Sequence, residues 1–274
     1  MIKILLPTDF SDSANEAAKL AIEICKLVKA SITFLHLMSF PQDYDQLKPE
    51  QRKKKYPDIT HTHEMALVKL NELNNEARNA ELSSESLIRN ESSLDFVKDY
   101  ASKYNFDLIV LGYKSSNDTL AKKYNSFAKH LVDTSETPVL ILKRPINTLK
   151  KAALLSDFSD EYVINEPWIN SFITKLKIDL TLACINTPSV FFDTRTAMQR
   201  MDRYKKHYDT PPASLLYNDY QFGSGIKHLC EDLKLDLIIM NTHGKTRRTY
   251  SGSSITSQVV ASTNCSILSL PVGV

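Results

Sequence analysis

The sequence contains an internal repeat, and this feature constrains the fold more than any other. Asp9 and Phe10 return as Asp157 and Phe158, 148 positions later. Four blocks recur in the same order: ILLPTDFSDS (4–13) as AALLSDFSDE (152–161), ITFLHL (32–37) as LTLACI (180–185), FDLIVLG (106–112) as LDLIIMN (235–241), and TPVLIL (137–142) as CSILSL (265–270). Because a duplicated sequence folds as a duplicated unit, the chain is expected to form two similar halves.

The length of the chain fits two domains. Its 274 residues are long for one ordinary domain and accommodate two of about 130 to 140 residues. The offset between the copies falls from 148 to 129, so the first half carries 19 additional residues in its middle. These lie around KPEQRKKKYPDITHTH (48–63), a polar, proline-broken stretch typical of a surface insertion. A boundary near 143–151 predicts domains at 1–145 and 150–274.

Both halves read as alternating strands and helices. Several strand segments are apolar throughout, which indicates a parallel sheet with helices on both faces, a doubly wound α/β fold. In each half the Ser and Asp residues after the first strand are expected to open a first helix. Strands are expected at 2–6, 31–38, 85–89, 107–111 and 138–142, with copies at 152–156, 178–185, 213–217, 236–240 and 266–270. Further helices are expected at about 63–81, 94–104 and 125–135, with copies at about 194–208, 223–234 and 253–263.

The ends of the first strands carry the first candidate site residues. Open parallel sheets bind ligands beyond the carboxyl ends of their strands, where the strand order reverses. Thr8-Asp9 and Ser156-Asp157 stand at these ends. The carboxylates can accept hydrogen bonds from a ribose or a base. The alternative is that Asp9, Ser11 and their copies only cap the following helix, and the residues alone leave both interpretations open.

The loop MNTHGKTRRTYSGSS (240–254) is the second candidate, because it follows a buried strand and combines glycine, basic and hydroxyl residues. Gly244 and Gly252 allow backbone N–H groups to face an anion. Ser253 or Ser254 is expected to open the next helix, whose free N–H groups and positive dipole end suit a phosphate. Lys245, Arg247 and Arg248 add positive charge. The alternative is a solvated basic loop that only connects strand to helix.

Both halves resemble the universal stress protein family over nearly the whole chain. The resemblance is carried by LLPTDFSDSANEAAKLA, DLIVLG, DLIIMNTHG and TPVLIL. It implies two five-stranded parallel sheets with strand order 3-2-1-4-5, paired through their last strands as an internal pseudo-dimer. In the family's nucleotide-binding members, the Asp after strand one and a backbone group at the end of strand two meet the adenosine. A G-x2-G-x9-G-[ST] loop after strand four meets the phosphates.

The two halves match this loop unequally. The first half reads Gly112-x2-Ser115-x9-Asn125-Ser126, which keeps the spacing and loses two of three glycines. The second half reads Asn241-x2-Gly244-x7-Gly252-Ser253, and an alignment from the last strand backwards puts Ser253-Ser254 at the final position instead. The resemblance therefore implies a nucleotide site in the second half, formed by Ser156, Asp157, Ile185, His243, Gly244, Lys245, Gly252, Ser253 and Ser254. The degenerate first-half equivalents are Thr8, Asp9, Leu37, Gly112, Ser115, Asn125 and Ser126.

Three functions are compatible with these residues. The leading hypothesis is a stress-response protein that binds ATP or AMP in its second half, requires no cofactor, and acts without catalysis through assembly or a protein partner. One alternative is a scaffold or signalling protein that binds no nucleotide, and another is a slow ATPase. No nucleophile motif or general base stands out, so no catalytic residue is predicted.

Other sequence features mainly narrow the class of protein. A net charge of +2 favours neither nucleic acid nor a membrane surface as partner, and no apolar run approaches the roughly 20 residues of a membrane span. The N-terminus reads as a strand, not a signal peptide, which predicts a cytoplasmic protein with reduced thiols. Its four cysteines, Cys25, Cys184, Cys230 and Cys265, sit singly, without a CxxC pair. His61, His63 and the RKKK run (52–55) are expected to be solvated, so no metal site is predicted, while a homodimer remains compatible with the sequence.

Overall fold

The computed structural model describes residues 1–91, 93, 95–113, 119–146, 148–159, 166–242, 256, 259–260 and 263–271. The first half of the chain contains β1 (Lys3–Pro7), α1 (Asp12–Val28), β2 (Ser31–Met38), a short 3-10 helix η1 (Tyr44–Gln46), α2 (Pro49–Lys55), α3 (Pro57–Asn79), β3 (Ser84–Asn90), α4 (Asp95–Lys103), β4 (Leu108–Gly112), α5 (Thr119–Thr134) and β5 (Val139–Leu142).

The second half repeats the same alternation. It contains β6 (Lys151–Leu155), α6 (Glu166–Leu176), β7 (Asp179–Asn186), α7 (Thr194–Lys205), β8 (Ala213–Asn218), α8 (Phe222–Leu233), β9 (Leu237–Thr242) and β10 (Ser266–Pro271). Most of the fourth helix, expected at 253–263, lies outside the described residues, although Thr256, Val259 and Val260 are helical. Every predicted strand is present, with ends that differ from the prediction by one or two residues.

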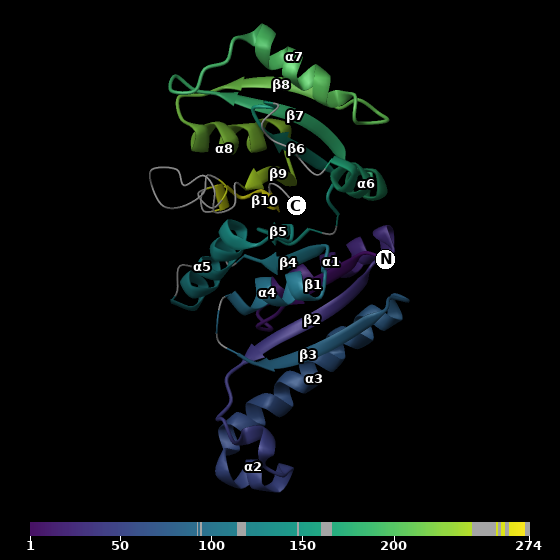
Figure 1. Cartoon of the computed structure of the whole chain (residues 1–274), viewed down its shortest axis with the longest axis vertical. Helices are drawn as coiled ribbons and strands as arrows, with labels where there is room; N and C mark the ends of the chain where they lie inside the picture. The colour runs from purple at the N-terminus through teal and green to yellow at the C-terminus, as the bar shows by residue number, and fades with distance from the viewer. Residues whose placement is uncertain are drawn as a thin grey trace.

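All ten strands form one sheet in the order β3-β2-β1-β4-β5-β10-β9-β6-β7-β8 (Figure 1). Within each half the strands pair in parallel, which confirms the expected order 3-2-1-4-5 twice. The junction is antiparallel, with Leu140 of β5 opposite Leu268 of β10. The expected pairing of the halves through their last strands is therefore confirmed.

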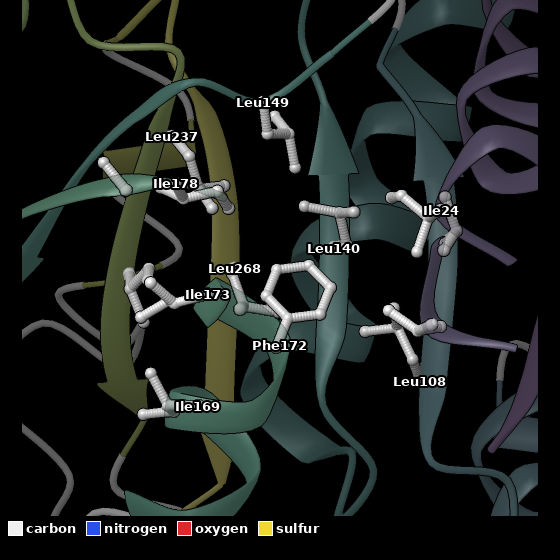
Figure 2. Packing of buried hydrophobic residues seen from close by; sticks show 14 of the residues in the cluster. Ile24, Leu108, Leu140, Leu149, Ile169, Phe172, Ile173, Ile178, Leu237 and Leu268 are labelled. Atoms are coloured by element: carbon white, nitrogen blue, oxygen red, sulfur yellow. The ribbon is translucent and has the colours of Figure 1, made fainter. Parts of the chain in front are cut away.

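Helices cover both faces of the sheet, and each face carries a hydrophobic core that runs through both halves. One core lies beneath α1, α3, α6 and α7, and the other beneath α4, α5 and α8. In Figure 2, Phe172 of α6 reaches toward Leu140 and Leu108 of the first half and Leu268 of the second. Burying such an aromatic side chain contributes roughly 1.5–3 kcal/mol, so the interface between the halves is part of the core.

The polar insertion at 48–63 is an ordered subdomain rather than a loop. Pro49 and Pro57 begin α2 and α3, because proline suits the first turn of a helix, where its missing N–H is not needed. As a result α3 begins six residues before the expected position near 63. Tyr44, which precedes the insertion in η1, is fully buried against it. Its ring stacks on Phe40 with centroids 4.8 Å apart, and its hydroxyl donates to Thr60 Oγ1 at 3.3 Å.

The basic run of the insertion is also more ordered than expected. The guanidinium of Arg52 lies 4.8 Å from the centroid of the Tyr44 ring, and its Nε donates to the Leu47 carbonyl at 2.9 Å. Lys53 pairs with Glu64, and Lys55 pairs with Asp43. These contacts hold the insertion on itself, so only part of the run meets the expectation of a freely solvated face.

Candidate functional site

The turn after β1 is held by the residues that the sequence marked as capping or binding groups. Ser11 is the N-cap of α1, and its Oγ accepts a hydrogen bond from the N–H of Ala14 at 3.4 Å. Asp9 Oδ1 in turn accepts the N–H of Ser11 at 3.1 Å and its hydroxyl at 2.5 Å. The capping interpretation is therefore correct for Ser11, while Asp9 positions the capping residue. This role occupies one carboxylate oxygen of Asp9.

The turn after β6 repeats this geometry in the second half. Asp157 Oδ1 accepts the N–H and the hydroxyl of Ser159 at 3.2 and 3.0 Å. Ser156 Oγ accepts the N–H of Phe158 at 3.0 Å, as Thr8 Oγ1 accepts that of Phe10. The helix expected after this turn is first described at Glu166 as α6, and residues 160–165 lie outside the described part of the chain.

Both turns contain the same strained residue. Phe10 has φ = 59° and Phe158 has φ = 49°, the left-handed region that bulky side chains avoid. Such a conformation costs about 1–3 kcal/mol and persists where the surroundings fix it, often at binding sites. Here the side-chain hydrogen bonds to Thr8 and Ser156 fix it. Because both copies contain this strained turn, the carboxyl ends of β1 and β6 are candidate ligand sites.

Strand two ends beside strand one in both halves. Thr8 N–H donates to the Leu35 carbonyl at 2.8 Å, and Ser156 N–H donates to the Ala183 carbonyl at 3.2 Å. Ile185 is buried, and a Cβ on Gly225 of α8 would lie 2.9 Å from its Cγ2. Its side chain therefore belongs to the core, so that only its backbone could meet the nucleotide that the resemblance implies. Leu37, the first-half equivalent, is partly buried against the same sheet face.

Asp157 also contacts α7 through Arg200. Arg200 of α7 donates from Nη1 to the Asp157 carbonyl oxygen at 3.3 Å, and its guanidinium lies 5.2 Å from the Phe192 ring centroid. Phe158 is buried with its ring centroid 5.2 Å from that of Tyr204. Burial, with the Asp157 charge nearby, raises the pKa of Cys184 to about 11. The second-half turn is thus braced by α7 and carries a fixed cation.

Gly112, the first glycine of the expected phosphate loop, has a structural reason to be glycine. A Cβ at this position would lie 2.1 Å from the carbonyl oxygen of Ser13, because the end of β4 runs against the first turn of α1. This close approach accounts for the glycine without a phosphate.

Two of the loop positions predicted to be degenerate in the first half lie within a helix. The fourth helix was expected from about 125, and α5 instead begins at Thr119. Asn125 and Ser126 therefore lie inside the helix, where their N–H groups bond to carbonyls one turn earlier. They cannot offer free donors to a phosphate. Ser115 lies outside the described residues.

Asn241 at the end of β9 replaces the first glycine of the second-half loop. The register of β6 and β9 pairs Leu155 with Met240, so Asn241 lies beside Ser156. Both side-chain atoms of its amide are buried, and neither has a hydrogen-bond partner among the described residues. Buried amide atoms without a partner are rare, because leaving one unpaired costs about 1–3 kcal/mol. Sequence reasoning treated Asn241 only as a defect in the loop, and its burial was not foreseeable.

The other predicted loop residues of the second half lie outside the described residues. They are His243, Gly244, Lys245, Gly252, Ser253 and Ser254. Their assignment to a nucleotide site therefore stays a prediction. Thr256, which follows them, is buried and donates from Oγ1 to the Asn241 carbonyl at 3.3 Å. This contact holds the end of the loop close to the end of β9.

An aspartate–histidine pair that the sequence did not reveal lies at the same edge of the sheet. Asp219 follows β8, and its Oδ2 lies 2.7 Å from Nδ1 of His228. Hydrogen bonds from Ser224 and His228 lower the pKa of Asp219 to about 2. The N–H of Asp219 donates to the Asn186 carbonyl at the end of β7. The signal available in the sequence, an Asp and a His nine positions apart, is too common to single out.

The expectation that His61 and His63 are solvated holds for His61 and is wrong for His63, which is half-buried. His61 is exposed, and His63 packs edge-on against the Phe40 ring, with centroids 5.0 Å apart. Burial lowers the pKa of His63. Among the described residues, no three His, Cys, Asp or Glu side chains gather closely enough to hold a metal ion. Within the same residues, no helix is long and apolar enough to cross a membrane.

Comparison with known proteins gives one family. The sequence profile of the universal stress protein family matches residues 1–143. No curated protein matches the chain.

Solved structures match the whole chain. A universal stress protein from Archaeoglobus fulgidus DSM 4304 has a TM-score of 0.72 at 14% identity, covering 99% of this chain and 98% of its own. A putative universal stress protein from Pseudomonas aeruginosa UCBPP-PA14 has a TM-score of 0.64 at 14% identity, covering 98% and 93%. A universal stress protein in complex with cAMP is 23% identical over 53% of this chain and 98% of its own, with a TM-score of 0.41. Identities this low show the fold alone.

Proposed function

Because the chain belongs to the universal stress protein family, we propose that its second half binds an adenine nucleotide, ATP or AMP, and that the protein acts without catalysing a reaction. The observation that carries the proposal is the buried amide of Asn241, whose donor and acceptor have no partner among the described residues. It lies beside Ser156, at the carboxyl edge of the sheet, where open parallel sheets bind ligands. A bound nucleotide supplies the donors and acceptors that such a group requires.

The proposed arrangement assigns one part of the nucleotide to each loop. The Asp157 carboxylate accepts from the ribose hydroxyls, because its hydrogen bonds to Ser159 engage only Oδ1. The backbone at Ile185 meets the adenine base. Arg200 supports the turn from behind by its hydrogen bond to the Asp157 carbonyl. The phosphates are bound by the loop residues His243, Gly244, Lys245, Gly252, Ser253 and Ser254.

The proposal places the site in the second half and not in the first. In the first half the Ser13 backbone occupies the space beside Gly112, and Asn125 and Ser126 lie within α5. With one competent half, one nucleotide is expected per chain. The nucleotide then acts as a ligand that biases assembly or the binding of a protein partner.

Calorimetric titration of the full chain with ATP and with AMP tests this proposal. Binding of one nucleotide per chain is expected, with loss of binding in Asp157→Ala. The matched control is Asp9→Ala, which removes the equivalent carboxylate of the first half and is expected to leave binding unchanged. Absence of heat at millimolar nucleotide, or equal loss in both variants, contradicts the proposal.

One alternative, a scaffold that binds no nucleotide, is favoured by the first-half loop, because Asn125 and Ser126 of this degenerate loop lie within α5. Native mass spectrometry of the purified chain discriminates between the two. A co-purifying mass of an adenine nucleotide contradicts the scaffold. Phosphate release from ATP that Asp157→Ala abolishes contradicts the absence of catalysis.

A further inference from the structure

Two of the four cysteines lie side by side in the tertiary structure. Cys230 is in the last turn of α8 and Cys265 directly precedes β10. Leu235 lies between them, since its N–H donates to the Cys230 carbonyl at 3.0 Å, and the two thiols are close enough to alter each other's pKa. Cys265 Sγ also lies 3.1 Å from the Leu235 carbonyl oxygen, to which it donates. Both cysteines belong to one buried cluster and line one cavity, where a side-chain rotation can bring the sulfurs together to the roughly 2.05 Å of a disulfide.

A cavity of about 320 Å³ gives a small oxidant access to this pair. Both thiols line it, although each cysteine is at least nine-tenths buried. Arg144, Lys227 and Lys234 also line the cavity, together with the single carboxylate of Glu231. The excess of positive charge favours the thiolate, which is the form that reacts with peroxides.

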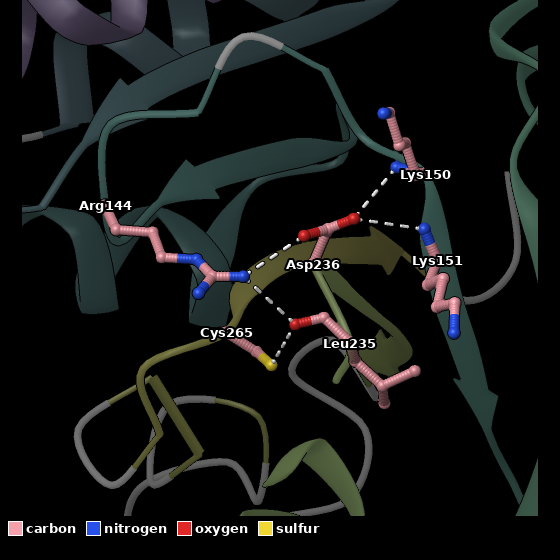
Figure 3. A network of polar contacts seen from close by, with 6 residues as sticks. All are labelled: Arg144, Lys150, Lys151, Leu235, Asp236 and Cys265. Atoms are coloured by element: carbon pink, nitrogen blue, oxygen red, sulfur yellow. Dashed lines mark hydrogen bonds and ion pairs between the residues drawn. The ribbon is translucent and has the colours of Figure 1, made fainter. Parts of the chain in front are cut away.

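Arg144 links the pair to the junction between the halves. Its Nη2 donates to the Leu235 carbonyl at 3.4 Å and to Asp236 Oδ1 at 3.1 Å, and Figure 3 shows that Cys265 points at the same carbonyl. The hydrogen bond with Cys230 lowers the pKa of Cys265 against the effect of burial, and the Arg144 charge lowers it further. The same hydrogen bond raises the pKa of Cys230. Because the Cys265 sulfur and the Arg144 guanidinium meet at the Leu235 carbonyl, the positive charge lies beside Cys265, and Cys265 is expected to react first.

The other two cysteines serve as internal references. Burial raises the pKa of Cys25 to about 12, and burial with the Asp157 charge raises that of Cys184 to about 11. Buried thiols of this kind react slowly, because little thiolate is present near neutral pH.

The first half shows that the fold itself does not need this pair. The offsets of the repeat match Cys230 with Ala101 and Cys265 with Thr137. The match is structural, since the Ala101 carbonyl accepts the N–H of Phe106 at 2.9 Å as the Cys230 carbonyl accepts that of Leu235 at 3.0 Å. The same packing position therefore holds alanine and threonine in one half and two adjacent thiols in the other.

We propose that Cys230 and Cys265 are a peroxide-sensitive pair that forms an intramolecular disulfide. The Cys265 thiolate attacks one oxygen of hydrogen peroxide, the O–O bond breaks, and the departing hydroxide takes up the thiol proton as water. The Cys230 sulfur then attacks the Cys265 sulfenic acid and displaces its hydroxyl, which leaves as a second water with the Cys230 proton. Two thiols lose two electrons and one peroxide becomes two waters. The bond ties α8 to β10, the strand that joins the halves.

Thiol counting and peptide mapping on the full chain test this pair. After treatment with equimolar hydrogen peroxide and denaturation, the number of free thiols is expected to fall from four to two. Mapping is expected to find one cross-linked pair of peptides containing Cys230 and Cys265, which dithiothreitol separates. Four remaining thiols, or loss of Cys25 and Cys184 at the same rate, contradict the proposal.

Variants copied from the first half separate the two sulfurs. In Cys230→Ala, the sulfenic acid at Cys265 lacks a resolving thiol, so it is expected to be trapped by dimedone or to proceed to sulfinic acid. In Cys265→Thr, all three remaining thiols are expected to stay reduced. Cys25→Ala is the control, which keeps the disulfide. Oxidation of Cys230 in Cys265→Thr, or cross-links between chains in place of the internal one, overturns the assignment.

Discussion

Leu268 of β10 lies directly opposite Leu140 of β5, in the antiparallel pairing that joins the two halves into one sheet. Both side chains are fully buried, and both belong to the core that contains Phe172 of α6 (Figure 2). Because the core runs across this junction, we expect the halves to unfold together.

Leu268→Ala is expected to destabilise the whole chain by about 2–5 kcal/mol, the usual range for a buried leucine truncated to alanine. Urea denaturation followed by far-UV circular dichroism measures this change. The control is Leu27→Ala at a half-exposed position of α1, where a change within about 0.5 kcal/mol is expected. Two separate transitions, of which only one responds to Leu268→Ala, contradict a shared core.

Gly112→Ala is expected to destabilise the protein by about 1–3 kcal/mol, since its Cβ would lie 2.1 Å from the Ser13 carbonyl oxygen and force α1 away from β4. The matched control is Gly223→Ala in the first turn of α8, where an added Cβ has no atom within 4 Å. Alanine there is expected to stabilise the helix by about 0.5–1 kcal/mol. Equal effects of the two substitutions in thermal unfolding disprove the close approach at Gly112.

Asn241→Leu is expected to separate stability from nucleotide binding. Replacing a buried amide that has no partner among the described residues removes a desolvation penalty, so the free protein is expected to gain about 1–2 kcal/mol. The same change is expected to weaken ATP or AMP binding at least tenfold, about 1.4 kcal/mol. Denaturation without ligand and calorimetry with ligand measure the two effects.

Asn186→Leu is the control for this experiment. Its buried amide exchanges hydrogen bonds with the Phe192 backbone at 3.0 and 2.9 Å. Removing these bonds leaves the Phe192 groups unpaired, so a loss of about 1–3 kcal/mol is expected. If Asn241→Leu destabilises the free protein as much as Asn186→Leu does, the Asn241 amide has a structural partner and the proposed ligand contact is wrong.

The lowered pKa of Lys143, which follows β5, predicts that the stability of the folded chain depends on pH. Burial, with Lys129 nearby, lowers the pKa of Lys143 to about 7 from its ordinary value of 10.5. Its ammonium lies 3.3 Å from the centroid of the Tyr113 ring and donates to the Val260 carbonyl of the second half. Between pH 7 and 10.5 the unfolded chain binds this proton and the folded chain does not, so stability rises with pH across this window.

Comparing the parent with Lys143→Met isolates this contribution. The variant is expected to be more stable than the parent at pH 7, and the difference is expected to shrink as the pH rises toward 10. Lys26→Met, at an exposed position of α1, is the control and is expected to show no such trend. A pH-independent difference between the parent and Lys143→Met rules out proton release by Lys143 on folding.

The sequence by itself determined the duplication, the α/β class and the positions of the strands, because burial patterns and turn residues are local properties. The strand order and the pairing of the halves were expected from the family resemblance, and the structure confirms both. The sequence also identified the turns at Asp9 and Asp157, although residue type alone could not separate a capping role from a binding role. The positive φ of Phe10 and Phe158 inside those turns had no sequence signal.

Tertiary structure alone decided which distant residues meet. Tyr44 organises the insertion through contacts with Phe40, Arg52 and Thr60. The amide atoms of Asn241 are buried although the residue itself is only half-buried. Cys230 and Cys265 look solitary in the sequence and line one cavity in the fold, because the end of α8 and the start of β10 belong to one buried cluster. Local pattern sets which elements form, whereas the contacts that create sites arise only when packing brings those elements together.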